Sequence, residues 1–198
     1  MNTKKIRLTG AQLSFSVGAI QENKAKILDT LEKSEKIQSD IVIFPELSIT
    51  GYPPEDLLLR ESFVGKNFAV LEEIAAFSGS TSAILGFVDR SLNEKSTDNF
   101  ERKISNAAAI VQNGDVKGIY HKCFLPNYSV FDEARYFSKG SKPADLFWYD
   151  DIAIGINICE DIWIEDGPAD LQVKAGASLI VNINASPFDI NKTNSRRK

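Results

Sequence analysis

Cysteine and histidine are scarce in this sequence of 198 residues, which contains two cysteines and one histidine. The cysteines, Cys123 and Cys159, are too few for a disulfide framework and lack the spacing of a metal site. We therefore expect no bound metal and a reducing, cytoplasmic setting. A glycine-rich phosphate loop is also missing, because neither Gly79 nor Gly86 is followed by the Lys-Ser or Lys-Thr pair of a P-loop.

Long apolar runs and an excess of positive charge are missing as well. No stretch has the length needed to span a bilayer, and the opening residues show no apolar run of a signal peptide, so we expect no membrane partner. The chain has 23 Lys and Arg against 27 Asp and Glu, a net charge of −4, and its basic residues are scattered apart from the segment 196–198. We therefore expect no nucleic-acid partner.

What is present is the composition of a globular domain, with 43% hydrophobic and 25% charged residues and enough length for one sizeable core. The apolar residues recur at helical spacing in some segments and at strand spacing in others. We expect strands at 6–13, 40–44, 83–88 and 178–185, helices at 20–37 and around 68–75, a loop at 91–103, and a hairpin of 107–111 with 116–120. This order predicts an α/β protein with a largely buried mixed sheet.

One further stretch, Ile152–Trp163, organises the prediction of function. Its isoleucines at 152, 154, 156 and 158 alternate with small or polar residues, which is typical of a buried strand, and Cys159 follows at the carboxyl end. Pro168 then starts a short helix that we expect to end near Ala175. A nucleophile is often placed at a sharp turn between a strand and a helix, which is the position predicted for Cys159. The alternative is that Cys159 is an inert buried thiol.

Two charged residues at other strand ends could serve this cysteine. Glu46 follows one predicted strand and Lys122 follows another, so in a mixed sheet both could meet Cys159 at one rim. A cysteine needs a base to become a thiolate and a positive group to hold the charge on the attacked carbonyl, and Glu46 and Lys122 have those properties. The alternatives are a solvated loop acid and a surface lysine. The thiol pKa could lie either way, because the cation favours the thiolate and the carboxylate opposes it.

The sequence leaves two rivals open. His121 could form a dyad with Cys159, as in thiol proteases. Strand alternation, however, points His121 and Lys122 in opposite directions, so at most one of them faces the site. Cys123 is the rival nucleophile, but it begins an irregular loop and lacks the strand-to-helix exit.

Three segments together resemble the signature segments of the nitrilase superfamily, whose members use a Glu-Lys-Cys triad: FPELSITGY at 44–52, YHK at 120–122 and NICEDIW at 157–163. Two longer segments, GYPPEDL at 51–57 and LPNYSVFDE at 125–133, resemble the glutaminase domains of glutamine-dependent NAD+ synthetases. The similarity extends from about Ile6 to Lys192. It implies a nitrilase-like four-layer α-β-β-α sandwich.

The resemblance also implies roles for individual residues. Cys159 matches the nucleophile, Glu46 the general base and Lys122 the residue that steadies the tetrahedral intermediate, with the backbone N–H of Glu160 as a second oxyanion donor. Glu133 resembles the second glutamate of the superfamily, a positioning group. The positions that match glutamine-binding residues or pocket aromatics are Tyr128, Ser186, Lys192, Tyr52 and Phe131.

In this family the glutaminase domain supplies ammonia to a synthetase domain that binds ATP and Mg and amidates deamido-NAD+, and the parent enzymes are expected to be homo-oligomers. The synthetase motif is missing here, since the nearest string, SGSTS at 78–82, does not match it. We therefore expect residues 1–198 to be an N-terminal glutamine amidohydrolase domain that is incomplete at its carboxyl end. The alternatives are a free-standing amidase of the superfamily and a non-catalytic, partner-binding fragment.

Overall fold

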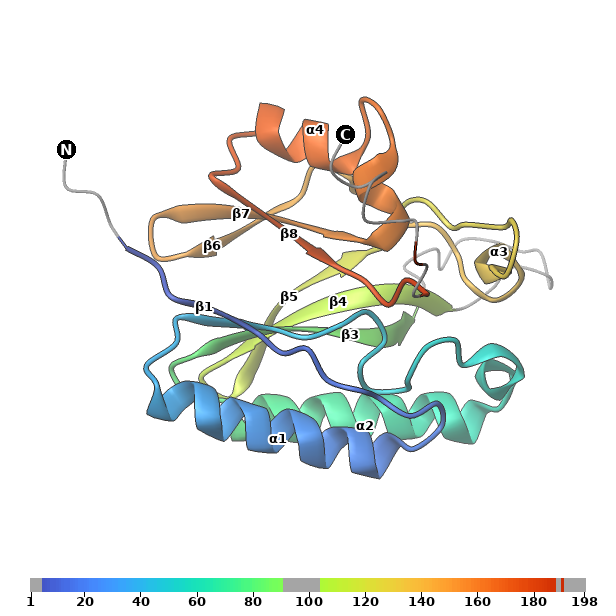
Figure 1. Cartoon of the computed structure of the whole chain (residues 1–198), viewed down its shortest axis with the longest axis horizontal. Coiled ribbons are helices and arrows are strands. Elements are labelled where there is room, and N and C mark those ends of the chain that lie inside the picture. Colours follow the sequence, from blue (N-terminus) through green and yellow to red (C-terminus); the bar gives the residue numbers. More distant parts are fainter. Residues whose placement is uncertain (1–4, 91–103, 188–189, 191–198) are drawn as a thin grey trace.

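Helices enclose two stacked sheets in the computed structural model, which describes residues 5–90, 104–187 and 190. α1 (Ile20–Lys36) and α2 (Glu61–Phe77) cover the outer face of a five-stranded sheet. A three-stranded sheet lies against the other face, and α4 (Pro168–Lys174) covers it from outside (Figure 1). This α-β-β-α arrangement confirms the four-layer sandwich. The predicted loop at 91–103 and the position of Lys192 lie outside the described residues.

The five-stranded sheet has the order β1-β2-β3-β4-β5. Its first three strands run parallel and its last two are added antiparallel, so β2 and β5 end at the same edge. A two-residue turn, Asn113-Gly114, joins β4 to β5 with φ values of 51° and 83°, which confirms the predicted hairpin. The bounds are β1 Leu8–Gly10, β2 Ile41–Ile43, β3 Ser82–Arg90, β4 Ile104–Gln112 and β5 Asp115–His121.

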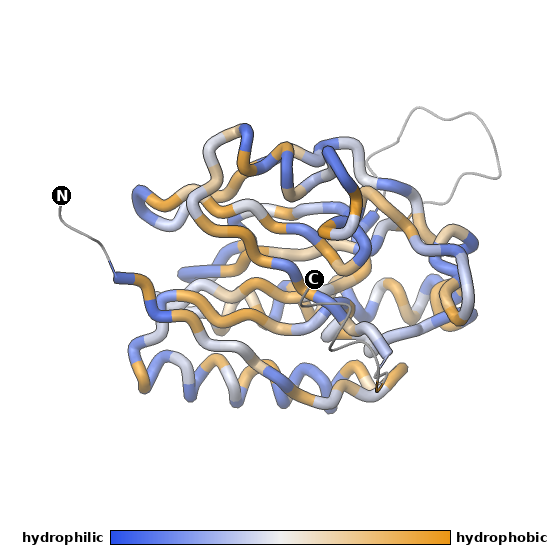
Figure 2. The backbone as a smooth tube through the Cα atoms, turned by 45° about the horizontal axis from the view of Figure 1, so that its top comes forward, coloured by the Kyte–Doolittle hydropathy of each residue, from blue (hydrophilic) through white to orange (hydrophobic). Residues whose placement is uncertain are grey.

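The second sheet comprises β6 (Leu146–Tyr149), β7 (Ile152–Ile158) and β8 (Leu179–Ile183). β7 lies in the middle, antiparallel to β6 and parallel to β8. The expectation of one mixed sheet is therefore wrong. Two sheets form because β7 and β8 bury isoleucine and valine side chains against β2, β3 and β4 in a layer between the sheets, and Figure 2 shows the apolar colour following the strands. β6 was not predicted, although its Leu-Phe-Trp-Tyr run and the following Asp-Asp turn were a signal for it.

The two long helices confirm the helical spacing in the sequence. Ile20, Ile27 and Leu31 are buried on α1, and Val70 and Ile74 are buried on α2; all belong to the cluster packed on the five-stranded sheet. A 3₁₀ helix, η1 (Glu55–Leu59), precedes α2, and a single-turn helix, α3 (Glu133–Tyr136), follows the long loop after β5. No helix in the described ranges is long and apolar enough to cross a membrane.

Gly86 allows the chain after β2 to cross close over β3. A Cβ on Gly86 would lie 2.6 Å from the carbonyl carbon of Glu46 and 2.7 Å from the carbonyl oxygen of Pro45. Leu47 next to them has φ of 48°, so this turn has little freedom to move away. Because residue 86 has no side chain, the turn that carries Glu46 can lie directly against β3.

We expect Gly86→Ala to lower the free energy of unfolding by about 1–3 kcal/mol, because the methyl group forces the turn off β3. Gly65→Ala is the matched control: a Cβ at this helical position meets nothing within 4 Å, and alanine there is expected to stabilise the protein. Urea unfolding of the two variants measures the difference. Equal stability of the Gly86 variant and the wild type would show that the turn moves freely.

Candidate active site

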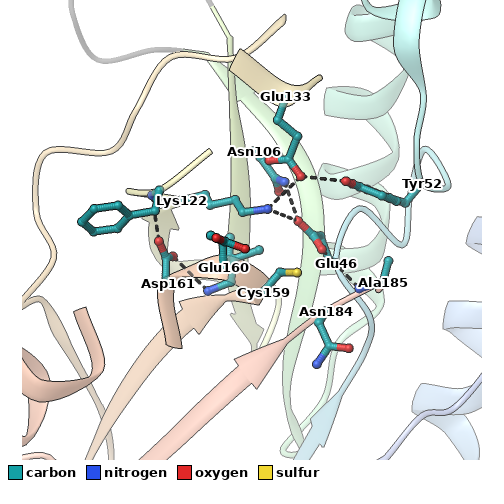
Figure 3. Close-up of polar contacts among 12 residues, drawn as sticks. Glu46, Tyr52, Asn106, Lys122, Glu133, Cys159, Glu160, Asp161, Asn184 and Ala185 are labelled. Carbon is teal, nitrogen blue, oxygen red and sulfur yellow. Dashed lines mark hydrogen bonds and ion pairs between the residues drawn. The ribbon is translucent and has the colours of Figure 1, made fainter. Parts of the chain in front are cut away.

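Three strand ends bring Glu46, Lys122 and Cys159 together. Glu46 follows β2 and Lys122 follows β5 in the five-stranded sheet, while Cys159 follows β7 in the other sheet. Their side chains point toward one another (Figure 3). The predicted convergence is confirmed, with one correction: the residues meet across two stacked sheets and not along the rim of one.

Lys122 is completely buried between two carboxylates. Its Nζ lies 2.7 Å from Glu46 Oε1 and 2.8 Å from Glu133 Oε1, and the Tyr52 hydroxyl donates to the same Glu133 oxygen at 2.8 Å. Burial by itself lowers the pKa of Lys122, but the charges of Glu46 and Glu133 outweigh it and raise the pKa above its ordinary value. Lys122 is therefore a fixed cation. The surface-lysine alternative is wrong.

Glu46 is 2% exposed, so the solvated-acid alternative is also wrong. Its Oε1 accepts hydrogen bonds from Lys122 and from Asn106 Nδ2 at 2.8 Å. Its Oε2 accepts the backbone N–H of Ala185 at 3.1 Å. Every donor to Glu46 thus has a defined place, and two of them, Asn106 and Ala185, were not identified from the sequence.

Glu133, at the start of α3, completes the buried set. It is 5% exposed and faces Lys122 and Tyr52. Burial and the nearby charge of Glu46 raise the pKa of Glu133, while Lys122 opposes that shift. The buried ammonium of Lys122 thus bridges the carboxylates of Glu46 and Glu133, and all three side chains are largely shielded from water.

Cys159 is 7% exposed and has φ of 46°, in the left-handed region that a residue with a side chain seldom adopts. It starts η2 (Cys159–Trp163), a 3₁₀ helix, so the chain turns sharply at the residue that ends β7. Sγ lies 3.5 Å from the Ser186 hydroxyl. Burial and the charge of Glu46 raise the pKa of the thiol to about 11, against the opposing effects of Lys122 and Ser186. The resting thiol is therefore protonated and needs a base.

Asp161 ties the two sheets together beside the site. Its Oδ1 accepts the N–H groups of Cys123 and Phe124 at 3.1 and 2.8 Å. Its Oδ2 accepts the N–H of Ile158 at 3.1 Å and the hydroxyl of Tyr120 at 3.0 Å. The carboxylate thus links the residues after Lys122 to the residue before Cys159. Sequence reasoning missed it, although it is the second acid after the cysteine.

Burial raises the pKa of Asp161 to about 6 from an ordinary value of 3.8. The folded state therefore binds more protons than the unfolded state between these values, and Asp161 contributes more stability as the pH falls from about 6 to about 4. Asp161→Asn cannot take up this proton and points an amide N–H at backbone donors. We expect it to be less stable by about 1–3 kcal/mol at neutral pH, with a larger deficit near pH 4. A constant deficit in urea unfolding across this range would contradict the assignment.

Two of the glutamine-binding positions proposed from the resemblance, Tyr128 and Ser186, lie near the catalytic set, whereas Lys192 falls outside the described residues. The hydroxyl of Tyr128, whose side chain is 56% exposed, donates to Glu160 Oε2 at 2.8 Å, and its ring meets that of Phe131 edge to face at 5.7 Å. Ser186 lies beside the thiol. The side chain of Glu160 thus faces Tyr128. Because Glu160 directly follows Cys159, its carboxylate lies close to the candidate nucleophile.

Two cavities flank Tyr52. One of about 380 Å³ is lined by Glu46, Tyr52 and Ser186, with Gln12, Phe15 and Asn184 among its other walls. The second, of about 240 Å³, lies at Glu133 and is lined by Phe131. The first has the size of a small-molecule site and contains the candidate base. Phe131 lines the cavity on the Glu133 side, and the wall formed by Gln12 and Phe15 was missed by sequence reasoning.

The rival assignments find no support in the geometry. His121 Nε2 lies 2.7 Å from Asp89 Oδ2, on the side opposite to Lys122, as strand alternation predicted. Cys123 is buried beside the Tyr120 hydroxyl at 3.5 Å, and burial raises the pKa of its thiol to about 11. Within the described ranges no three side chains of metal-binding type form a cluster. Glu46, Lys122 and Glu133 are therefore the ionisable side chains that act on the Cys159 thiol.

Comparison with known proteins agrees with this geometry. The model of the carbon-nitrogen hydrolase family matches residues 7–196. The chain belongs to the carbon-nitrogen hydrolase family. Among curated relatives of this carbon-nitrogen hydrolase, the glutamine-dependent NAD(+) synthetase of Aquifex aeolicus is 43% identical over 94% of this chain and 31% of that protein. The enzyme of the same name from Thermotoga maritima is 38% identical over 96% of this chain and 31% of that protein.

Solved structures show the same relationship. Glutamine-dependent NAD+ synthetase from Acinetobacter baumannii superposes on this carbon-nitrogen hydrolase with a TM-score of 0.84 and 34% identity, over 98% of this chain and 35% of that chain. An amidase from Nesterenkonia sp. shares the fold, with a TM-score of 0.78 at 18% identity, over 95% of this chain and 68% of that chain. The chain thus spans about a third of the length of the synthetases that it matches.

Proposed function

We propose that this carbon-nitrogen hydrolase chain hydrolyses the side-chain amide of glutamine and supplies the ammonia to a synthetase domain that amidates deamido-NAD+. The observation that carries the proposal is the buried set of Glu46, Lys122 and Cys159, with the lysine between two carboxylates and the thiol beside them. The similarity to glutamine-dependent NAD(+) synthetases over 94% of the chain supports glutamine as the substrate.

Acylation begins with the proton on Cys159. A thiol with a pKa of about 11 is not nucleophilic enough at neutral pH, so a neighbouring base has to remove its proton during attack. Glu46 fills this role. The sulfur then attacks the amide carbon of glutamine, the proton passes to the departing nitrogen, and ammonia leaves a glutamyl thioester. Water, deprotonated by Glu46, releases glutamate.

The tetrahedral intermediates carry a negative oxygen. Lys122 and the backbone N–H of Glu160 hold it, each contributing about 2.7–4 kcal/mol as oxyanion donors in comparable sites do. A lysine ammonium has three N–H donors, and two are committed to Glu46 and Glu133, which leaves one for the substrate. The buried carboxylates fix the direction of that third donor.

The ends of glutamine require opposite charges. The carboxylate of Glu160, held by the Tyr128 hydroxyl, faces the α-ammonium group, and Lys192 binds the α-carboxylate. Ser186 contacts the substrate next to the thiol, and Tyr52 and Phe131 supply aromatic walls. This arrangement would favour glutamine over amides that lack the α-amino acid group.

The partner expected for this activity is a synthetase domain that binds ATP and Mg. Relatives three times as long as the matched region support such a domain, for which residues 1–198 would be the N-terminal glutaminase part. The active enzyme would be a homo-oligomer of the cytoplasm, a setting that suits the free thiols of Cys123 and Cys159.

The test is an assay of glutamate and ammonia release by the purified protein, with and without the synthetase domain supplied. Glutamine, asparagine and short aliphatic amides are compared at equal concentration. We expect release from glutamine well above the others. Turnover of aliphatic amides without turnover of glutamine would favour a free-standing amidase, and no turnover under either condition would favour a non-catalytic, partner-binding chain.

A further inference from the structure

Asn106 contacts both Glu46 and Lys122. It lies in β4 opposite Val88 and is completely buried. Its side-chain amide donates from Nδ2 to Glu46 Oε1 at 2.8 Å (Figure 3). Its backbone carbonyl accepts the N–H of Lys122 at 2.9 Å. One residue therefore holds the side chain of the base and the main chain of the cation.

The contacts of Glu46 distinguish its two oxygens. Oε1 accepts from Lys122 and Asn106, which occupies both of its lone pairs. Oε2 accepts one donor, the N–H of Ala185, among the described residues, and so keeps a lone pair. Only Oε2 can take up a proton without giving up a hydrogen bond.

The oxygen of the Asn106 side chain has no hydrogen-bond partner within the part of the chain that the structure describes. A buried amide oxygen without a donor costs stability. Leucine has a similar shape and would remove that cost, but it would also leave Glu46 Oε1 with Lys122 as its one remaining donor among the contacts seen here. The asparagine is thus better suited to holding the carboxylate than to packing.

We propose that Asn106 is a positioning residue for glutamine hydrolysis, which fixes Glu46 Oε1 so that Oε2 is the oxygen that takes the proton of Cys159. This inference rests on the proposed function. In the step concerned, the S–H bond breaks as the O–H bond to Oε2 and the S–C bond to glutamine form. The same proton then leaves Oε2 for the amide nitrogen as the C–N bond breaks, so Glu46 ends as a carboxylate.

The test compares Asn106→Ala and Asn106→Leu with a matched control, Asn67→Ala. Asn67 is also completely buried, and its side chain pairs with both backbone groups of Val88, the residue opposite Asn106 in the sheet. The hydrogen bonds of Glu46 and Lys122 run to other residues. Loss of stability alone would therefore affect the two sites alike, whereas loss of positioning would affect Asn106 alone.

We expect the Asn106 variants to lower kcat by about ten- to a hundredfold with KM within about twofold, as for loss of one hydrogen bond to a charged group. Asn67→Ala should keep kcat. If either folded Asn106 variant keeps wild-type kcat, or if Asn67→Ala loses as much kcat, the proposal is overturned.

A second readout separates this proposal from the proposed function. The rate of alkylation of Cys159 by iodoacetamide, measured by peptide mass with Cys123 as internal reference, requires no glutamine. We expect slower alkylation of Cys159 in the Asn106 variants. Slower alkylation in a protein that hydrolyses no glutamine would reject the substrate and keep the role of Asn106, and unchanged alkylation would reject that role.

Discussion

Cys159→Ala is expected to reduce glutamine hydrolysis by more than about 10⁴-fold, because Cys159 is the thiol that points toward Glu46 and Lys122, whereas the Cys123 thiol lies against Tyr120. The residue removed is small and lies at a strained turn with φ of 46°, so alanine should leave the fold intact. Synthesis from added free ammonia by the assembled synthetase should persist, since that chemistry would take place in another domain. Both activities are measured on the same preparation.

Cys123→Ala is the control for a buried thiol, because both cysteines are 7% exposed and have a pKa raised to about 11. It should keep most of the hydrolysis. Loss of both activities in the Cys159 variant would mean that the residue or its role is misassigned, and loss of hydrolysis with Cys123→Ala alone would move the nucleophile to the loop after β5.

Lys122→Ala is expected to cost about 10³-fold or more in kcat/KM, far more than His121→Ala. Removing Lys122 leaves Glu46 and Glu133 facing each other without the cation between them, and it also takes away an oxyanion donor. His121 instead pairs with Asp89 and faces away from the site. Kinetics of glutamate release by the two variants give the ranking.

Stability must be measured alongside, because truncating one partner of a buried ion pair costs about 3–5 kcal/mol. Lys122→Met also removes the cation but keeps most of the side-chain volume, so comparing it with Lys122→Ala separates the loss of charge from the loss of packing. A larger effect of His121→Ala than of either Lys122 variant would favour a Cys-His mechanism and contradict the triad.

The three residues at strand ends could be predicted from the sequence, because ionisable side chains directly after apolar runs stand out. An isoleucine run that stops at Cys159, and acids and lysines that follow apolar runs, mark Glu46, Lys122 and Cys159 before any partner is known. Alternation along β5 also separated His121 from Lys122 correctly. Local spacing was sufficient for these features.

The partners of those residues could not be predicted, because they depend on how distant strands stack. Asn106 follows Ser105 near the start of a largely apolar strand, and only the crossing of the β2 exit over β3 brings Glu46 to it. Asp161 meets Phe124 only because the second sheet packs on the first. The separation into two sheets has the same origin, since alternation shows which residues are buried and not which sheet buries them.

Trapping the acyl enzyme shows whether Cys159 forms a glutamyl thioester. The protein, with the synthetase domain supplied, is mixed with glutamine and quenched in acid, and its peptides are analysed by mass spectrometry. We expect a mass increase of one glutamyl group on the peptide that contains Cys159, absent from Cys159→Ala and abolished by hydroxylamine. Glutamate release without an adduct on Cys159 at any quench time, or an adduct on Cys123, would contradict the account.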